Sequence, residues 1–168
     1  MKDVVIVDSV RTGLAKAFRG SFNLTRSDDM LAHCIDSLLD RNPNLGADEV
    51  EDVVVGAASH TGEQDGNLAR LAVILSKLPV TAAGVTINRF CSSGSQTISL
   101  ASDTIRAGNA DIIIAGGVES MSMVAMGGNK PIAYPGLMEV LPNAYAAMGT
   151  TAEVVVYVAP SQASTVTD

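Results

Sequence analysis

The sequence has 168 residues, of which 47% are hydrophobic and 17% are charged, with a formal net charge of −7. This composition fits one folded domain with a substantial core and excludes a disordered chain. The basic residues are scattered, so the focused basic face that nucleic acid requires is missing and we expect no nucleic acid partner. The apolar run near the N-terminus is interrupted by Asp8, which is too short and too charged for a signal peptide or a membrane span. We therefore expect a cytoplasmic protein with no membrane partner.

The chain has two cysteines, Cys34 and Cys91, and two histidines, His33 and His60. A secreted disulfide scaffold has more cysteines, so this pattern indicates a reducing compartment. Paired cysteines with zinc spacing are missing, and we expect no metal. Because adjacent helix positions point in different directions, Cys34 beside His33 is interpreted as a core thiol next to a surface histidine rather than as a catalytic pair.

Strands and helices are predicted to alternate along the first 120 residues. β-branched runs indicate buried strands, and apolar residues spaced by three and four indicate helices. The predicted strands cover Val4–Val10, Asp52–Ala58, Val85–Asn88 and Asp111–Gly117, and the predicted helices cover Leu24–Arg41, Asn67–Leu78 and Ser92–Ala107. Ser27 is a candidate cap of the first helix, which Asn42 and Pro43 end.

This order, β-α-β-α-β-α-β, predicts an α/β fold with a mostly parallel sheet covered on both faces. After Ser120 the sequence is rich in Met, Gly and Pro, which predicts an irregular loop region. In the last stretch, VVVYV is a candidate strand, and the residues that follow are polar without a period. The expected segments are therefore 1–120, 121–153 and an atypical tail, 154–168.

Cys91 lies where a predicted strand meets a predicted helix, in the sequence NRFCSSGSQ. The first N–H groups of a helix lack partners inside it, and the helix dipole adds partial positive charge. Both effects favour a reactive thiolate, and the same N–H groups can stabilise an oxyanion. A buried structural cysteine is the alternative, but Ser92, Ser93 and Gly94 leave the sulfur uncrowded. The helix that follows is rich in small residues with little charge, which predicts burial between two layers, of which this chain supplies only one.

Five segments, in this order, resemble successive motifs of the thiolase family: VVIVDSVRT, GEQDGNLAR, GVTINRFCSSGSQ, AGGVESMS and AMGTTAE. They extend from the N-terminus to Glu153. The resemblance implies the N-terminal half of a thiolase, whose layer has the order β-α-β-α-β-α-β-β. Such enzymes transfer an acyl group between coenzyme A thioesters, cleaving 3-ketoacyl-CoA or making acetoacetyl-CoA. Acyl-CoA or acetyl-CoA is then the substrate, and no separate cofactor is expected.

The resemblance also implies roles for particular residues. Cys91 matches the cysteine that is acylated, and its backbone N–H matches a donor of the oxyanion hole. Met148 resembles a methionine that lines the acyl pocket. Gly62–Arg70 resembles a loop at a subunit interface, and Val85–Asn88 resembles the strand that pairs across the family's dimer axis, so a homodimer or homotetramer is expected. Glu119 matches a motif position near the site, but no catalytic role is assigned to it.

Several parts of the thiolase pattern are missing from this sequence. The family needs a histidine from a GHPxG-like motif and a second cysteine from a CxGxG-like motif, and neither motif occurs here. Ala147 stands where many biosynthetic members have histidine, and from Val154 the sequence departs from the family. We therefore expect an incomplete thiolase that requires a C-terminal half. The alternatives are a condensing enzyme similar to ketoacyl synthases, or a non-catalytic fragment or assembly partner.

Overall fold

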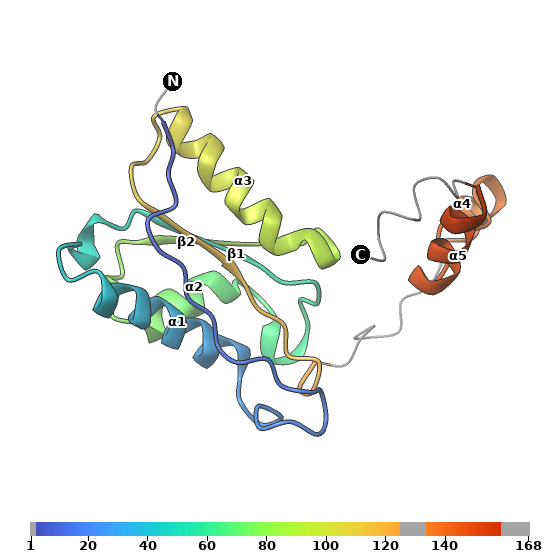
Figure 1. The fold of residues 1–168 in the computed structure, drawn as a ribbon, viewed down its shortest axis with the longest axis horizontal. Coiled ribbons are helices and arrows are strands. Elements are labelled where there is room, and N and C mark those ends of the chain that lie inside the picture. Colours follow the sequence, from blue (N-terminus) through green and yellow to red (C-terminus); the bar gives the residue numbers. More distant parts are fainter. Residues whose placement is uncertain (1–2, 125–133, 159–168) are drawn as a thin grey trace. The chain divides into compact units, whose positions relative to one another are not determined.

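The computed structural model describes residues 3–124 and 134–158, and the chain divides into two units, Met1–Asn129 and Lys130–Asp168 (Figure 1). The first unit contains α1 (Ser27–Arg41), β1 (Asp52–Gly56), α2 (Leu68–Leu75), β2 (Ala83–Ile87), α3 (Ser93–Arg106) and β3 (Ile113–Gly117). It also contains the 3-10 turns η1 (Ala47–Glu49), η2 (Gly62–Gln64) and η3 (Phe90–Ser92). The second unit contains α4 (Pro135–Val140) and α5 (Met148–Val158).

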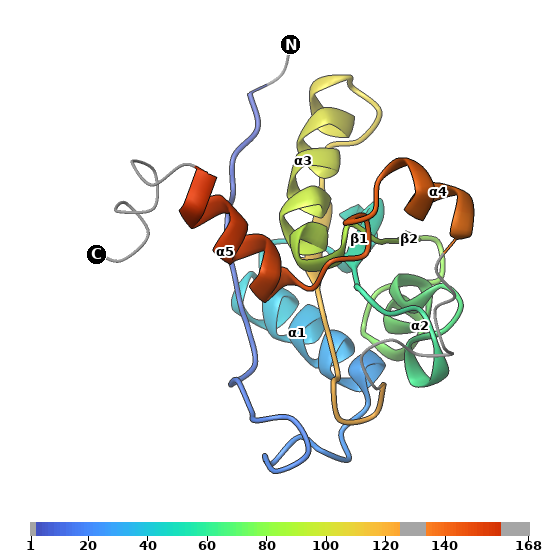
Figure 2. The same cartoon turned by 90° about the vertical axis from the view of Figure 1, so that its right-hand side faces the viewer.

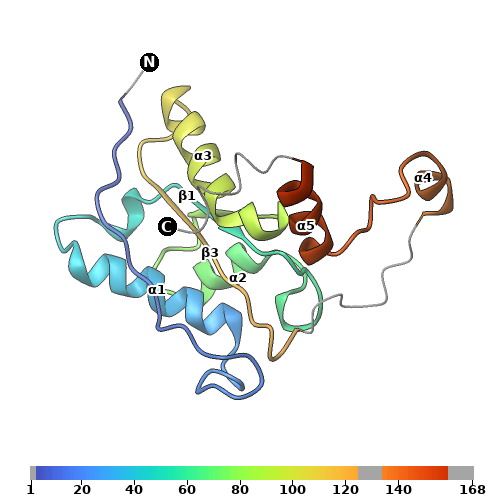
Figure 3. The same cartoon turned by 45° about the vertical axis from the view of Figure 1, so that its right-hand side comes forward.

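The described strands form one parallel sheet in the order β2-β1-β3. Val54 in the central strand is in register with Val85 on one side and with Ala115 on the other. Helices α1 and α2 lie on one face of the sheet and α3 lies on the opposite face (Figure 3). The predicted α/β fold with a parallel sheet is therefore confirmed. Within the described residues, no helix is long and apolar enough to cross a bilayer.

The core of the first unit lies between the sheet and the pair α1 and α2. Successive side chains of a strand point to opposite faces. Val53 and Val55 belong to the core cluster on the α1–α2 side, together with Ile35 of α1 and Leu68 of α2. Val54, between them, is also buried. Burial on both faces explains why this strand is a continuous run of valines rather than an alternating pattern.

The predicted strand over Val4–Val10 is wrong for the described structure. This segment is extended but unpaired, and Val5, Ile6 and Val7 are 76%, 76% and 83% exposed. A strand exists only through hydrogen bonds to a neighbour, and none of the described strands pairs with this segment. The segment is instead fixed by Asp8, which bonds Arg41 and Asn42 at the C-terminal end of α1. Figure 2 shows the N-terminal segment running past α1.

The ends of the helices differ from the prediction by a few residues. Helix α1 begins at Ser27 rather than Leu24, and Arg26 is the N-cap residue. Ser27 is not the cap: its side chain is fully buried, and its hydroxyl has no hydrogen-bond partner among the described residues. The helix ends at Arg41 with Asn42 as its C-cap, as predicted. Helix α2 begins after Asn67, whose side chain accepts a hydrogen bond from the N–H of Arg70.

The second unit corrects the prediction of a strand at VVVYV, because these residues form the C-terminal part of α5. β-branched residues have a modest helix propensity, but a helix satisfies its backbone groups locally and needs no partner strand. The N–H of Thr151 bonds the carbonyl of Ala147 at 3.0 Å and starts this local pattern. Part of the predicted irregular region, 125–133, and part of the tail, 159–168, lie outside the described residues, and the three expected segments stay a prediction.

Candidate functional site

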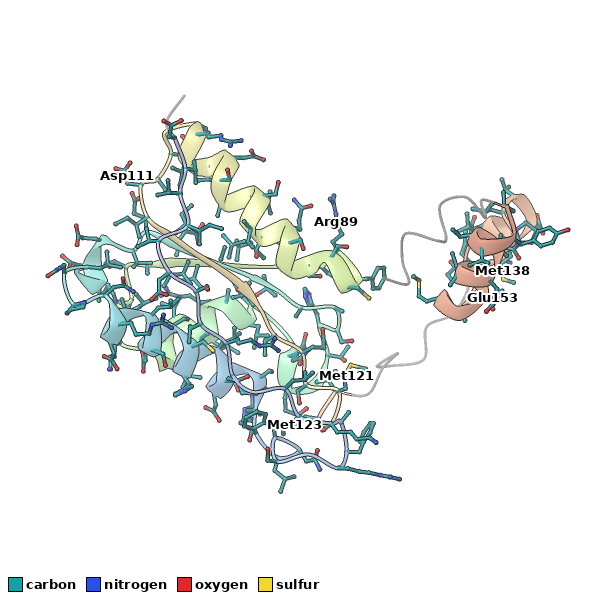
Figure 4. The ribbon with its side chains drawn as sticks, in the orientation of Figure 1. Arg89, Asp111, Met121, Met123, Met138 and Glu153 are labelled. Atoms are coloured by element: carbon teal, nitrogen blue, oxygen red, sulfur yellow. The ribbon has the colours of Figure 1, made fainter. Side chains whose placement is uncertain are left out.

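Cys91 is exposed and lies in η3, between the end of β2 and the start of α3. The strand-to-helix junction predicted from the sequence is therefore present. Because the three strands are parallel, the loops after β1 and β3 lie at the same edge of the sheet as the Cys91 loop. Figure 4 shows Arg89 beside the N-terminal end of α3 and Asp111 near its opposite end. Cys91 thus lies at the carboxyl edge of the sheet, where ligands bind in many open α/β sheets.

Local hydrogen bonds fix the backbone around Cys91. Phe90 has a positive φ of 46°, an uncommon conformation for a residue with a side chain. The Phe90 N–H donates to Asn88 Oδ1 at 2.8 Å, and Ser93 Oγ donates to the Phe90 carbonyl at 2.7 Å. The N–H groups of Ser92 and Ser93 bond the carbonyls of Arg89 and Phe90 in the η3 turn. None of these bonds in the described loop uses the N–H of Cys91, which is the expected oxyanion donor.

Two glycines allow the start of α3 to pack closely on the strands. A Cβ atom on Gly56, the last residue of β1, would lie 2.5 Å from the carbonyl carbon of Ser93. A Cβ on Gly117, the last residue of β3, would lie 3.0 Å from the carbonyl oxygen of Gly56 and 3.4 Å from the Cα of Gly94. Glycine at a strand end often marks such a close approach. The sequence shows both glycines but does not reveal which backbone they contact.

Helix α3 is buried on the face that packs on the sheet, and its opposite face is exposed in the described structure. Ser93, Thr97 and Ala101 are buried against the sheet, whereas Ile98 and Leu100 are 49% and 38% exposed. The described chain supplies one of the two layers expected around this helix, and the second layer stays a prediction. The outer face of α3 is therefore open in the described structure.

The other predicted residues do not gather around Cys91. Cys34 is half-buried and His33 is exposed on α1, which confirms their interpretation as a packed thiol beside a surface histidine. Cys34 lines a pocket of about 550 Å³ between the segment 10–17, α1 and the sheet. His60 lies in the loop after β1, and its Nε2 has no partner among the described residues. Within the described part of the chain no three metal-ligating side chains gather, and the absence of a metal stays an expectation.

Met148 is the first residue of α5 in the second unit and is 76% exposed. Its predicted place in an acyl pocket stays a prediction. Glu119 follows β3, and its carboxylate accepts hydrogen bonds from the Ala58 N–H and the Gln64 amide, each at 2.7 Å. Gln64 was not singled out from the sequence. The signal that could have found it is its place in the GEQDGNLAR segment, one of the motifs that carry the family resemblance.

The fold and the site define an α/β protein that presents a cysteine at the start of a helix, at the carboxyl edge of a parallel sheet. A family model described as "Thiolase, N-terminal domain" matches residues 4–158, which extends past Glu153, where a departure from the family was expected. The chain therefore belongs to the thiolase family and corresponds to its N-terminal domain.

Relatives of this chain are named as 3-ketoacyl-CoA thiolases. Those of Aeromonas salmonicida and Aeromonas hydrophila are each 42% identical to it over 153 residues, and that of Pseudoalteromonas atlantica is 39% identical over the same length. Each comparison covers 91% of this chain but only 39% of the relative. The chain thus spans about two fifths of the length of the curated relatives it matches.

Proposed function

We propose that this chain carries the nucleophile of a thiolase-type acyltransferase, and that Cys91 accepts the acyl group. The observation that carries the proposal is the position of Cys91, exposed in the turn that begins α3, in a chain that matches the thiolase N-terminal domain. A cysteine attacks as its thiolate, and the exposed position leaves Sγ open to an acyl-CoA. The relatives named 3-ketoacyl-CoA thiolase support this reaction over that of a ketoacyl synthase.

In the proposed step, the Cys91 thiolate attacks the carbonyl carbon of an acyl-CoA thioester. A bond forms between Sγ and the acyl carbon, and the bond from that carbon to the CoA sulfur breaks, so CoA leaves as a thiolate. In this proposal the Cys91 N–H donates to the oxyanion of the tetrahedral intermediate. The hydrogen bonds of the turn do not use this N–H, which supports the assignment. No oxidant, reductant or separate cofactor enters this balance.

Turnover needs more than this step. In the family resemblance, a histidine and a second cysteine, from motifs that this sequence lacks, move the proton in the condensing or cleaving half-reaction. We propose that these groups come from a C-terminal thiolase half, whether in the same chain or in a partner. The open face of α3, with Ile98 and Leu100 exposed, supports a second layer there. A chain that only contributes an interface is the alternative, and it predicts no acylation of Cys91.

Self-association is also part of this proposal. Among the described strands, β2 is at an edge of the sheet, and an unpaired edge is a template for pairing with another chain. Pairing of two β2 strands would give the homodimer that the family resemblance implies. Light scattering after size exclusion tests it, because a monomer at micromolar concentration contradicts the pairing. The cytoplasmic location stays a prediction.

Intact mass spectrometry after incubation with acetyl-CoA tests the proposed acylation. The wild-type chain and Cys34→Ala are expected to gain one acetyl group, and Cys91→Ala none. Acetylation that persists in Cys91→Ala, or that is lost in Cys34→Ala, would contradict the assignment. No adduct on any variant would contradict acylation by this chain alone. The same assay with the complementing half present then decides between the acyltransferase and the interface-only alternative.

A further inference from the structure

Gln64 lies at the centre of a hydrogen-bond network that joins the loops at the carboxyl edge of the sheet. Its side chain is fully buried. Its amide nitrogen donates to the Ser59 carbonyl at 2.8 Å and to Glu119 Oε1 at 2.7 Å, and its amide oxygen accepts from the Ser120 N–H at 2.7 Å. Both amide hydrogens and the oxygen are thus used. Because the side chain is buried, water cannot replace these partners without disturbing the structure.

Glu119 completes the link between the loop after β3 and the loop after β1. One carboxylate oxygen accepts from Gln64, and the other accepts from the Ala58 N–H at 2.7 Å. Hydrogen bonds to an ionised carboxylate are roughly twice as strong as bonds between neutral groups. The residues that follow β1 and β3 are therefore held together by a carboxylate and an amide.

Asn88 extends the same network to the nucleophile loop. Its Nδ2 donates to the Ala58 carbonyl at 2.9 Å, and its Oδ1 accepts from the Phe90 N–H at 2.8 Å. Both backbone polar groups of Ala58 are then used, one toward Glu119 and one toward Asn88. A continuous path of hydrogen bonds runs from Ser120 through Gln64, Glu119, Ala58 and Asn88 to Phe90, the residue before Cys91.

We propose that Gln64 and Glu119 are a positioning pair that holds the Cys91 loop in register with the carboxyl ends of all three strands. This proposal rests on the proposed function, because the loop that the pair positions carries the acyl-accepting cysteine. Neither side chain touches the reacting atoms in this assignment. They act through Ala58 and Asn88, and their effect is to keep the strained turn at Phe90 in one conformation. The position of the Cys91 Sγ relative to the Cys91 N–H then stays the same.

The test uses Glu119→Gln in the full chain, with Glu63→Gln as the matched control. A glutamine at 119 presents one acceptor oxygen where the carboxylate presents two, so either the Ala58 N–H or the Gln64 amide loses its partner. Glu63 is adjacent to Gln64 but outside the network, and its substitution removes the same charge. Hydrogen exchange followed by mass spectrometry reports the mobility of the loops without any acyl-CoA.

In Glu119→Gln, we expect exchange to become about tenfold faster both in residues 57–60 and in residues 88–93, while Glu63→Gln stays within about twofold of the wild type. The acetylation rate of Cys91 by acetyl-CoA should fall by about tenfold, and its alkylation by the small reagent iodoacetamide by less than about threefold, because alkylation needs the thiolate but not an oriented thioester. Faster exchange in 57–60 with an unchanged 88–93 would overturn the proposal.

Asn88→Asp provides a second, milder variant. Aspartate keeps the acceptor for the Phe90 N–H but removes the donor to the Ala58 carbonyl, so it cuts only the path between the two loops. If Glu119→Gln fails to fold, as judged by circular dichroism, Asn88→Asp decides: faster exchange in 88–93 supports the positioning role, and unchanged exchange overturns it. If the wild-type chain is not acetylated, the proposed acylation by this chain fails while the exchange data still decide this inference.

Discussion

Gly56 at the end of β1 lies directly against Ser93 at the start of α3, so close that a Cβ atom on Gly56 would lie 2.5 Å from the Ser93 carbonyl carbon. The neighbouring atoms are the carbonyl group of Ser93 and its Cβ, which is bonded directly to the backbone, so none of them can rotate away as the end of a long side chain can. The contact fixes the height of the helix start above the sheet. It therefore also fixes the position of Cys91, two residues earlier in the chain.

Gly56→Ala is expected to lower the free energy of unfolding by about 1–3 kcal/mol, because the added methyl group forces the start of α3 away from the strand. Chemical denaturation measures the change, and alkylation of Cys91 reports the shift of the loop. Gly94→Ala is the matched control, because a Cβ there has nothing within 4 Å outside its own turn of helix. That control should be neutral or more stable by up to about 1 kcal/mol. Equal effects of the two substitutions would contradict the close-contact explanation.

Thr97 joins α3 to the sheet through its hydroxyl group. The side chain is fully buried, and Oγ1 lies 2.7 Å from the Gly94 carbonyl and 3.1 Å from the Gly116 carbonyl of β3. Thr97→Val keeps the shape but removes the donor, and it is expected to cost about 1–2 kcal/mol. Thr104→Val removes a hydroxyl that bonds the Leu100 carbonyl in the same helix and should cost less than about 0.5 kcal/mol. Thermal unfolding of both variants checks the difference, and a larger loss at position 104 would refute it.

Asp28 makes stability depend on pH. Burial acts to raise the pKa of this carboxyl, but the hydrogen bonds and charge of Arg26 and the backbone N–H of Asp29 outweigh it, so the pKa lies below its ordinary value. Arg26 holds the carboxylate through Nε at 3.0 Å and Nη2 at 2.8 Å. A lowered folded-state pKa adds stability above the unfolded-state pKa of about 3.9, and this stability is lost as the pH falls through the folded-state pKa.

Asp28→Asn should therefore lower the free energy of unfolding by about 2 kcal/mol at pH 7, and its stability should converge with that of the wild type as the pH falls below about 4. Urea denaturation across this pH range measures the difference. Asp29→Asn removes a neighbouring exposed charge from the same first turn of α1, and it should change stability by less than about 1 kcal/mol. A constant difference between Asp28→Asn and the wild type at all pH values would contradict the ion pair as its cause.

Asp8 anchors the extended N-terminal segment to the end of α1. Its carboxylate accepts from Asn42 Nδ2 at 3.0 Å and pairs with Arg41 at 2.7 Å. The hydrogen bond from Asn42, that from the Ser9 N–H and the charge of Arg41 lower its pKa, against a smaller opposing effect of burial. Asp8→Ala should raise the backbone mobility of residues 3–10, measured by NMR relaxation, and leave that of α1 unchanged. Acid should release the segment in the wild type once the pH falls below this lowered pKa. Mobility that does not respond to either change would show that other contacts hold the segment.

Much of the first unit could be predicted from the sequence because its signals are local. The valine run gave β1, and the apolar spacing around Leu31 and Ile35 gave α1. The observed ends of the helices differ from the predicted ends by a few residues, as at Ser27, because a cap depends on which side chain reaches which N–H. The junction that holds Cys91 was also local, since a strand, a turn and a helix follow one another there along the chain.

The sequence by itself determined the order of strands and helices from α1 to β3, the family of the chain and the place of Cys91 at a helix start, because each depends on residues that are neighbours along the chain. The tertiary structure alone decided that Val4–Val10 stays unpaired, that α3 is covered on one face, and that Gln64 and Glu119 connect the loops after β1 and β3. These features depend on contacts between segments far apart in sequence. The same apolar run or polar side chain has a different role when its spatial neighbour changes, and no local pattern specifies that neighbour.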